Sequence, residues 1–264
     1  MGFAMPSAAL LDRQPAERYT PADQATWATL LGRQRPFLDG RAHPRYLACL
    51  DALGLTPDRI PDLEEVSERL RALTGWSLVP CEGLVHEDVF FDLLVHRKFP
   101  VTWWIRRPDQ LDYLPEPDLF HDLFGHVPLL GDPDFSAYME AYGRAGQHAK
   151  ALGKKPLRQL TRLYWWTVEF GLIQSTPNQA PLIYGAGIVS SLAESRMAAP
   201  LPGEGEGPKV KPFDLTKALR TKFIYTDFQP SYFVINSYAD LTAALAQDLD
   251  AIYDTIATQP VLTP

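Results

Sequence analysis

The sequence lacks the features by which several classes of protein are recognised. It has no apolar run that approaches the roughly 20 residues needed to span a bilayer, so we expect no membrane association. The first residues, MGFAMPSAALLDRQ, have no basic segment ahead of their apolar stretch, so we expect no signal peptide. No unit of about 20 to 50 residues repeats along the chain, which excludes a repeat architecture.

Cysteine and clustered basic charge are also scarce. The two cysteines, Cys49 and Cys81, form no C-x-x-C pair, so we expect free thiols in a cytoplasmic protein. The formal net charge is −7, and the densest basic segment, GKKPLR at 153–158, is short. Contacts to a phosphate backbone need clustered Lys and Arg, so we expect no nucleic-acid partner.

Helical signals dominate a composition that is otherwise typical of globular proteins, with 46% hydrophobic residues among 264. Thr20 is a candidate N-cap with Pro21 at the first helical position, and Gly75 closes the segment PDLEEVSERLRALTG. The segment HEDVFFDLLVHRKF predicts a helix that stops at Pro100, and DLTAALAQDLDAIYDTI predicts a closing helix.

Strand signals are few and short. The β-branched and aromatic run VTWWI at 101–105 predicts a strand, and FIYTDFQPSYFVINSY predicts a small two-strand unit. The Gly- and Pro-rich segment 201–212 predicts a surface loop. We therefore expect a mostly α-helical fold with a few short β-strands. It should form one domain over 1–264, with loosely ordered ends at 1–19 and 257–264.

The segment PDLFHDLFGHVPLL carries two histidines, His121 and His126, in an apolar run. On an ideal α-helix, five residues rotate the side chain by about 140°, so the two imidazoles would not share a face. Gly125 and Pro128 predict that the helix ends here, which would let the second histidine turn back from a non-helical segment. Taken alone, the pair fits core histidines as well as a metal site.

Glu169 is a candidate third ligand, because it is an acid inside the aromatic segment YWWTVEFGL. Ionised glutamate is rarely buried without a partner; the alternatives are a salt bridge to Arg or Lys and a partly exposed carboxylate. Two histidines and a carboxylate form the ligand set of non-haem Fe(II) oxygenases, and zinc hydrolases use the same set.

Aromatic residues in the same segments favour iron, because they suit a pocket for an aromatic substrate or a planar cofactor. About half of them are expected to be core. They are Trp103, Trp104, Phe120, Phe124, Trp165, Trp166 and Phe170.

The segments PEPDLFHDLFGHVPLL, YWWTVEFGL and YGAGIVSS resemble the pterin-dependent aromatic amino acid hydroxylases, above all the short bacterial members that act on phenylalanine. The resemblance runs from about residue 70 to 240. It implies the catalytic-domain fold of that family, with Fe(II), tetrahydrobiopterin and O₂, and the conversion of L-phenylalanine to L-tyrosine. By the same resemblance, His121, His126 and Glu169 are the iron ligands.

The resemblance implies roles for further residues, which fall into three groups. Pterin contacts are implied for Gly83, Leu84, Val85, Phe90 and Tyr164. Substrate contacts are implied for Arg106, Pro117, His121, Trp165 and Ser190. Phe90 would stack on the pterin ring and Arg106 would hold the substrate carboxylate. Glu169 and Tyr164 are catalytic candidates, and Asp118 is spaced to orient His121.

Asp122 is a further catalytic candidate, because it lies beside His121 in the sequence. It would neighbour the ligands, handle a proton, or lie on the helix surface. The substrate could also be tryptophan or tyrosine, the triad could hold Zn²⁺ in a hydrolase, and a binding domain could hold a structural metal. No regulatory or tetramerisation segment is recognised, so we expect a cytoplasmic monomer whose partners are small molecules.

Overall fold

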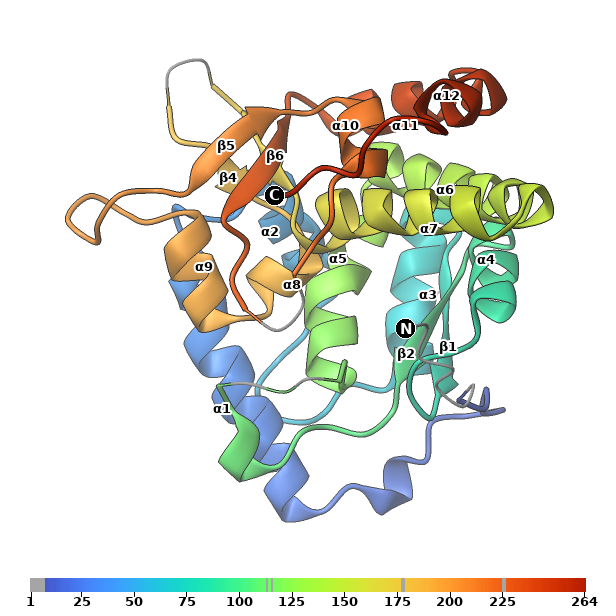
Figure 1. Cartoon of the computed structure of the whole chain (residues 1–264). Coiled ribbons are helices and arrows are strands. Elements are labelled where there is room, and N and C mark those ends of the chain that lie inside the picture. The colour runs from blue at the N-terminus through green and yellow to red at the C-terminus, as the bar shows by residue number, and fades with distance from the viewer. Residues whose placement is uncertain (1–7, 113, 115, 177–178, 225–226) are drawn as a thin grey trace.

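The computed structural model describes residues 8–112, 114, 116–176, 179–224 and 227–264 (Figure 1). The α-helices are α1 (Pro21–Phe37), α2 (Pro44–Ala52), α3 (Leu63–Thr74), α4 (Glu87–Val95), α5 (Val127–Leu130), α6 (Pro133–Leu152), α7 (Lys154–Tyr164), α8 (Ala186–Val189), α9 (Leu192–Ala198), α10 (Leu215–Arg220), α11 (Tyr238–Leu245) and α12 (Leu249–Ile256). Two π-helices, η3 (His121–His126) and η4 (Trp165–Glu169), and two 3₁₀ turns, η1 (Ala16–Arg18) and η2 (Pro108–Gln110), complete the helical elements.

The strands form two small sheets. They are β1 (Ser77–Cys81), β2 (Lys98–Thr102), β3 (Leu172–Ile173), β4 (Leu182–Ile183), β5 (Lys209–Pro212) and β6 (Ser231–Ile235). β1 and β2 pair in parallel, and the second sheet has the order β4-β3-β6-β5. Within it β3 pairs antiparallel with β4, and β6 pairs in parallel with both β3 and β5. The predicted mostly helical fold with short strands is confirmed.

Helix ends that depend on local sequence agree with the prediction. The Thr20 side chain accepts a hydrogen bond from the Asp23 amide, and Pro21 opens α1. Gly75 ends α3 in the left-handed conformation, with φ of 81°, where a side chain would be strained. The side chain that caps the start of α3 is Asp62, whose carboxylate accepts from two backbone amides.

Elements that depend on distant partners differ from the prediction. α4 ends at Val95, and Pro100 lies inside β2, so the predicted stop and the strand at 101–105 are wrong in their bounds. In the described part of FIYTDFQPSYFVINSY only β6 forms, and it pairs with β3 and β5 rather than with a neighbour in that segment. The predicted closing helix is two helices, α11 and α12, and the predicted loop 201–212 ends in β5.

The described parts of both chain ends make specific contacts, although loose ends were expected. Near the N-terminus, Leu10 forms a β-bridge with Cys81, and the Tyr19 hydroxyl hydrogen-bonds to the Trp103 carbonyl. Near the C-terminus, Leu262 forms a bridge with Thr221. These contacts hold both ends against the helical body.

Both cysteines are free, as expected, and burial raises the pKa of each thiol to about 11. Among the described helices, none combines the length and the apolar composition that crossing a membrane requires.

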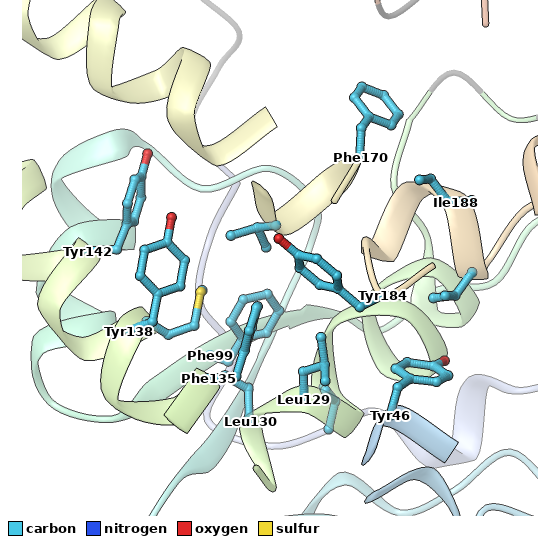
Figure 2. Close-up of a cluster of buried hydrophobic side chains, with 14 of the residues drawn as sticks. Tyr46, Phe99, Leu129, Leu130, Phe135, Tyr138, Tyr142, Phe170, Tyr184 and Ile188 are labelled. Carbon is cyan, nitrogen blue, oxygen red and sulfur yellow. The ribbon is translucent and has the colours of Figure 1, made fainter. Parts of the chain in front are cut away.

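The core is a single cluster of buried apolar and aromatic side chains. Figure 2 shows part of it, where Phe135, Tyr138 and Tyr142 from α6 lie near Phe99 of β2 and Tyr184. Tyrosines are prominent in this cluster, and most place their hydroxyls on hydrogen-bond partners; Tyr138 bonds to the Thr167 hydroxyl at 2.8 Å. The core is therefore aromatic and internally hydrogen-bonded, which suits a rigid scaffold around buried polar groups.

Close packing of α4 on α6 depends on two glycines of α6, Gly143 and Gly146. A Cβ at Gly143 would lie 2.8 Å from the Leu94 Cβ and 2.9 Å from the Val95 amide nitrogen. Those neighbours are attached to the α4 backbone and cannot move aside. The absence of a side chain at 143 therefore sets the separation of the two helices.

We expect Gly143→Ala to lower the free energy of unfolding by about 1–3 kcal/mol, because the two backbones must separate. Gly32 is the matched control: it lies in α1, where an added Cβ would have no atom within 4 Å. Gly32→Ala should raise stability by about 0.5–1 kcal/mol through helix propensity. Urea denaturation of both variants measures this; a neutral Gly143→Ala would show that the helix separation is adjustable.

A buried acid outside the histidine segment predicts a pH-dependent stability. Glu194 of α9 is buried and accepts a hydrogen bond from the Tyr232 hydroxyl at 2.5 Å. Burial raises the pKa of Glu194 from 4.5 to about 7. A raised pKa in the folded state contributes stability below about 4.5, and this contribution is lost as the pH rises through about 7.

We therefore expect the free energy of unfolding to fall across that pH range by roughly 2–3 kcal/mol from this group. Glu194→Gln keeps the size of the side chain and removes the titration, so its stability should vary less with pH. Urea denaturation at a series of pH values checks this. If the free energy of unfolding changed with pH equally in the two proteins, the raised pKa of Glu194 would be contradicted.

Candidate metal centre

His121 and His126 lie on the π-helix η3, whose wider turn brings them to one face. The Val127 amide donates to the Asp122 carbonyl, five residues earlier, instead of four as in an α-helix. The two imidazoles are edge to face with ring centroids 4.8 Å apart, and their Nε2 atoms are 3.1 Å apart. The expectation that the helix ends before His126 is wrong, because η3 continues directly into α5.

Two residues that were expected to break this helix have other functions. Pro128 has no amide hydrogen, so the Phe124 carbonyl four residues earlier lacks its α-helical donor. The buried Tyr46 hydroxyl donates to that carbonyl at 2.6 Å instead. Gly125 lets α8 approach, because a Cβ there would lie 2.9 Å from the Ala186 carbonyl oxygen. Nothing in the sequence around Tyr46 identifies this contact.

Glu169 comes from the second π-helix, η4, and faces both histidines. The Phe170 amide donates to the Trp165 carbonyl at 2.9 Å, again five residues earlier. Glu169 Oε1 lies 3.1 Å from His126 Nε2, and Oε2 lies 3.7 Å from His121 Nε2. The carboxylate is buried, so the partly exposed alternative is wrong. The basic side chains that it faces are histidines rather than Arg or Lys.

The hydrogen-bond partners of His121 leave its Nε2 free for a metal. The Ser190 hydroxyl donates to the Ala186 carbonyl at 2.8 Å and lies 3.0 Å from His121 Nδ1. A hydroxyl has one hydrogen, so Ser190 accepts from His121 Nδ1–H, and the lone pair is then on Nε2. That nitrogen points at His126 and Glu169.

The charges in this cluster depend on one another. Burial lowers the pKa of His121 to about 4, which keeps it neutral. Burial alone would raise the pKa of Glu169, but His126 and His121 lower it overall. Burial alone would lower the pKa of His126, but Glu169 raises it overall. Neutral His121 and ionised Glu169 are in the forms that bind a metal, whereas His126, whose pKa is raised, must lose its proton to do so.

The distances also fit a shared metal ion. Two ligand atoms about 2.1 Å from one ion, at right angles to each other, lie about 3.0 Å apart. The observed separations of 3.1 Å between the imidazole nitrogens and 3.1 Å to Glu169 Oε1 are close to this. The three donors therefore form a compact N₂O set that could hold a divalent metal and leave its other face open.

Asp122 offers an alternative third donor. One of its carboxylate oxygens lies with the two imidazoles in a group whose members are within 4.8 Å of one another. However, Asp122 Oδ2 already accepts the Thr102 backbone amide at 2.7 Å. Asp122 is buried, and burial raises its pKa to about 6, so its placement on the helix surface is wrong. We favour Glu169 because it faces the Nε2 atoms of both histidines.

Arg106 and Asp118 form a buried ion pair beside η3. Arg106 Nε and Nη2 donate to the two oxygens of Asp118 at 2.9 and 2.8 Å. Asp118 also accepts the His121 backbone amide at 3.0 Å. Asp118 therefore positions the backbone of His121, whereas the imidazole is oriented by Ser190. The remaining Arg106 nitrogen, Nη1, makes only a long hydrogen bond of 3.4 Å to the Leu111 carbonyl.

The residues expected to contact the pterin are only partly linked to the cluster. Phe90 lies edge to face with Tyr164 at 5.7 Å, and Tyr164 lies 6.1 Å from the His126 ring. Gly83, Leu84 and Val85 lie in the turn between β1 and α4, where Leu84 is 53% exposed. No recorded contact among the described residues joins that turn to the histidines.

Two of the expected substrate-pocket residues lie next to the elements that carry the triad. Pro117 comes shortly before η3, and Trp165 is the first residue of η4. Trp165 is half-buried and stacks on Phe223, with centroids 4.3 Å apart and an interplanar angle of 10°. Pro117 is half-buried and directly precedes Asp118. Other aromatics of these segments are core: Phe120 and Phe124 stack on each other, and the Trp166 indole donates to the Thr221 carbonyl.

Known proteins of one enzyme family are similar to this chain over nearly its whole length. The model of the biopterin-dependent aromatic amino acid hydroxylase family matches residues 11–256. The phenylalanine-4-hydroxylase of Chromobacterium violaceum is 48% identical over 244 residues, covering 92% of this chain and 80% of the relative. That of Ralstonia nicotianae is 47% identical over 247 residues, covering 94% and 76%.

Solved structures agree with these relatives. The crystal structure of Chromobacterium violaceum phenylalanine hydroxylase with bound iron(III) and oxidised cofactor 7,8-dihydrobiopterin has a TM-score of 0.86 at 48% identity. It covers 95% of this chain and 87% of that chain. The cobalt-bound form of the same enzyme has a TM-score of 0.90 at 47% identity, covering 98% and 90%.

The contact between Ser190 and His121 gives a direct test of the cluster. We expect Ser190→Ala to weaken divalent-metal binding by about tenfold to a hundredfold, because His121 loses the partner that fixes its tautomer. Ser191→Ala is the matched control: its side chain caps α9 through the Glu194 amide, so it should cost about 1 kcal/mol of stability and leave metal affinity unchanged. Competition with a chelator measures the affinities; equal loss in both variants would contradict the assigned tautomer.

Proposed function

Because the chain belongs to the biopterin-dependent aromatic amino acid hydroxylase family, we propose that it converts L-phenylalanine to L-tyrosine. The reaction would use O₂ and tetrahydrobiopterin at a mononuclear non-haem Fe(II) centre. The observation that carries the proposal is the convergence of two imidazoles and one carboxylate on a single point. The identity of 48% to a phenylalanine-4-hydroxylase supports the choice of substrate.

In this proposal His121, His126 and Glu169 are the ligands of Fe(II). When bound together, Fe(II) and tetrahydrobiopterin supply the activation of O₂ that hydroxylation of an aromatic ring requires. The chain supplies these three donors from two helical turns, which would leave the remaining coordination positions of the ion for other ligands. The buried aromatic side chains around them keep bulk water away from the reacting groups.

We propose that Arg106 and Trp165 orient the amino acid substrate. The pair with Asp118 fixes the plane of the Arg106 guanidinium, and Nη1 is the donor available to a carboxylate. Trp165, held by its stack on Phe223, would form one wall of the side-chain pocket, with Pro117 as another. His121 and Ser190 would border the same pocket, which couples substrate position to the metal ligand.

We propose that Phe90 and Tyr164 contact the pterin, together with Gly83, Leu84 and Val85. The half-buried ring of Phe90 lies beside Tyr164, which in turn lies beside His126. This row of rings would place a stacked pterin next to the metal. Asp122 would take up and release a proton near the same site, because burial raises the pKa of its carboxyl to about 6.

We propose further that the chain is one catalytic domain that acts as a monomer in the cytoplasm. A single core cluster that includes residues of almost every element supports one domain. The free thiols of Cys49 and Cys81 suit a reducing compartment. All residues assigned to the site come from one chain, so no second copy is needed to complete it.

Removing the carboxylate ligand tests the function. We expect Glu169→Gln, like His121→Ala, to abolish turnover and to lower iron occupancy while the fold survives, because the ion loses one of three protein ligands. The assay is anaerobic loading with Fe(II), followed by turnover with phenylalanine, tryptophan and tyrosine side by side. Glu65→Gln is the control, because it makes the same substitution at an exposed position of α3. It should leave turnover and iron occupancy unchanged.

Activity of Glu169→Gln at the wild-type level would refute the ligand assignment. Turnover with zinc and none with iron would refute the proposal that the protein is an oxygenase. Faster turnover with tryptophan or tyrosine would show that phenylalanine is not the preferred substrate.

A further inference from the structure

A cavity lies on one side of α7 and has a volume of about 290 Å³. Five of the nine side chains that line it are basic. Lys154, Lys155, Arg158 and Arg162 come from α7, and Arg220 comes from the end of α10. The chain that follows α12 closes the cavity with Gln259 and Val261. Figure 1 shows α10 and α12 close to α7, and no acidic side chain is among the lining residues.

Arg162 is a buried cation whose charge has no counter-charge in the described part of the chain. Its exposed fraction is only 9%, and its recorded hydrogen bonds run from Nη1 to the carbonyls of Leu219 and Arg220, at 3.2 and 3.4 Å. Carbonyl oxygens accept hydrogen bonds but do not neutralise a charge. Burying an unpaired charge costs several kcal/mol in general, and burial together with Arg158 lowers the pKa of Arg162.

The other cations of the cavity also lack acidic partners among the described residues. Arg220 donates to the Pro260 carbonyl at 3.1 and 2.9 Å, and Lys155 donates to the Ala257 carbonyl. No ion pair is recorded for Lys154 or Arg158. Elsewhere basic side chains of this acidic protein commonly pair with carboxylates; examples are Arg13–Glu17, Arg35–Asp39 and Arg144–Glu140.

The start of α7 adds to the positive potential of this cavity. Gly153 is the N-cap, no side chain caps the helix, and no acidic residue lies in its first turn. The uncapped amides and the helix dipole favour an anion at such an end. Three features therefore coincide here: a hollow, a buried guanidinium without counter-charge, and an open helix N-terminus with two lysines.

We propose that this cavity binds a small phosphate-type dianion, either free phosphate or the phosphate group of a small metabolite. Guanidinium groups match phosphate oxygens through pairs of parallel hydrogen bonds. The cavity has several positive charges, and a dianion neutralises more of them than a single carboxylate can. The volume of about 290 Å³ is at the lower end for small-molecule sites, which favours a small ligand over a macromolecule. The site shares no residue with the metal centre, so this proposal does not rest on the proposed hydroxylation.

The test is isothermal titration calorimetry of the iron-loaded protein at low ionic strength, with inorganic phosphate in one arm and glycerol 3-phosphate in the other. We expect saturable binding of one anion per chain. In Lys154→Glu combined with Arg158→Glu, both of which are exposed, affinity should fall at least tenfold. Lys98→Glu combined with Lys209→Glu changes the net charge equally at exposed positions outside the cavity and should change affinity less than twofold.

Tighter binding of glycerol 3-phosphate would identify a metabolite phosphate, and equal or tighter binding of inorganic phosphate would identify the free ion. Absence of saturable binding in both arms would overturn the proposal. So would equal affinities in the two double variants, because the binding would then follow net charge or the metal rather than this cavity.

Discussion

The site depends on one constraint, the hydrogen bonding between residues five apart in η3 and η4. An α-helix would turn His126 away from His121, but the wider turn of η3 places the two imidazoles edge to face on one side of the helix. The wide turn gives up regular hydrogen bonds, and the core compensates: the Tyr46 hydroxyl binds the carbonyl that Pro128 leaves without a donor. Glu169 reaches the same point through the same device in η4.

Burial then determines how the charged groups around this point are arranged. An ionised carboxylate is stable there only beside a positive charge or a metal, which is why Glu169 and His126 shift each other's pKa in opposite directions. Asp118 performs two tasks at once, because one buried carboxylate holds both Arg106 and the His121 backbone. A change in the position of Arg106 would therefore be transmitted to a ligand of the proposed metal.

The parts of this structure that could be predicted from sequence are those decided by near neighbours. The cap at Thr20 and the stop at Gly75 need only local residues, and both were predicted. Pro100 was misassigned because a parallel strand partner, β1, accommodates it. The histidine pair and Glu169 were recognised as a set. The π-helical turn that joins them could not be, since it depends on Tyr46, which lies 78 residues from Phe124 in the chain.

One continuous helical segment links the two charged regions of the molecule. α7 begins with the lysines of the basic cavity and runs without interruption into η4, which ends at Glu169. Arg162 is two residues before Tyr164, and its hydrogen bonds to Leu219 and Arg220 tie this part of the helix to α10. The Trp166 indole, bonded to Thr221, repeats that tie one turn later. Because the rigid segment has few ways to bend between these ties, the position of the carboxylate at its end is set by contacts made along its whole length.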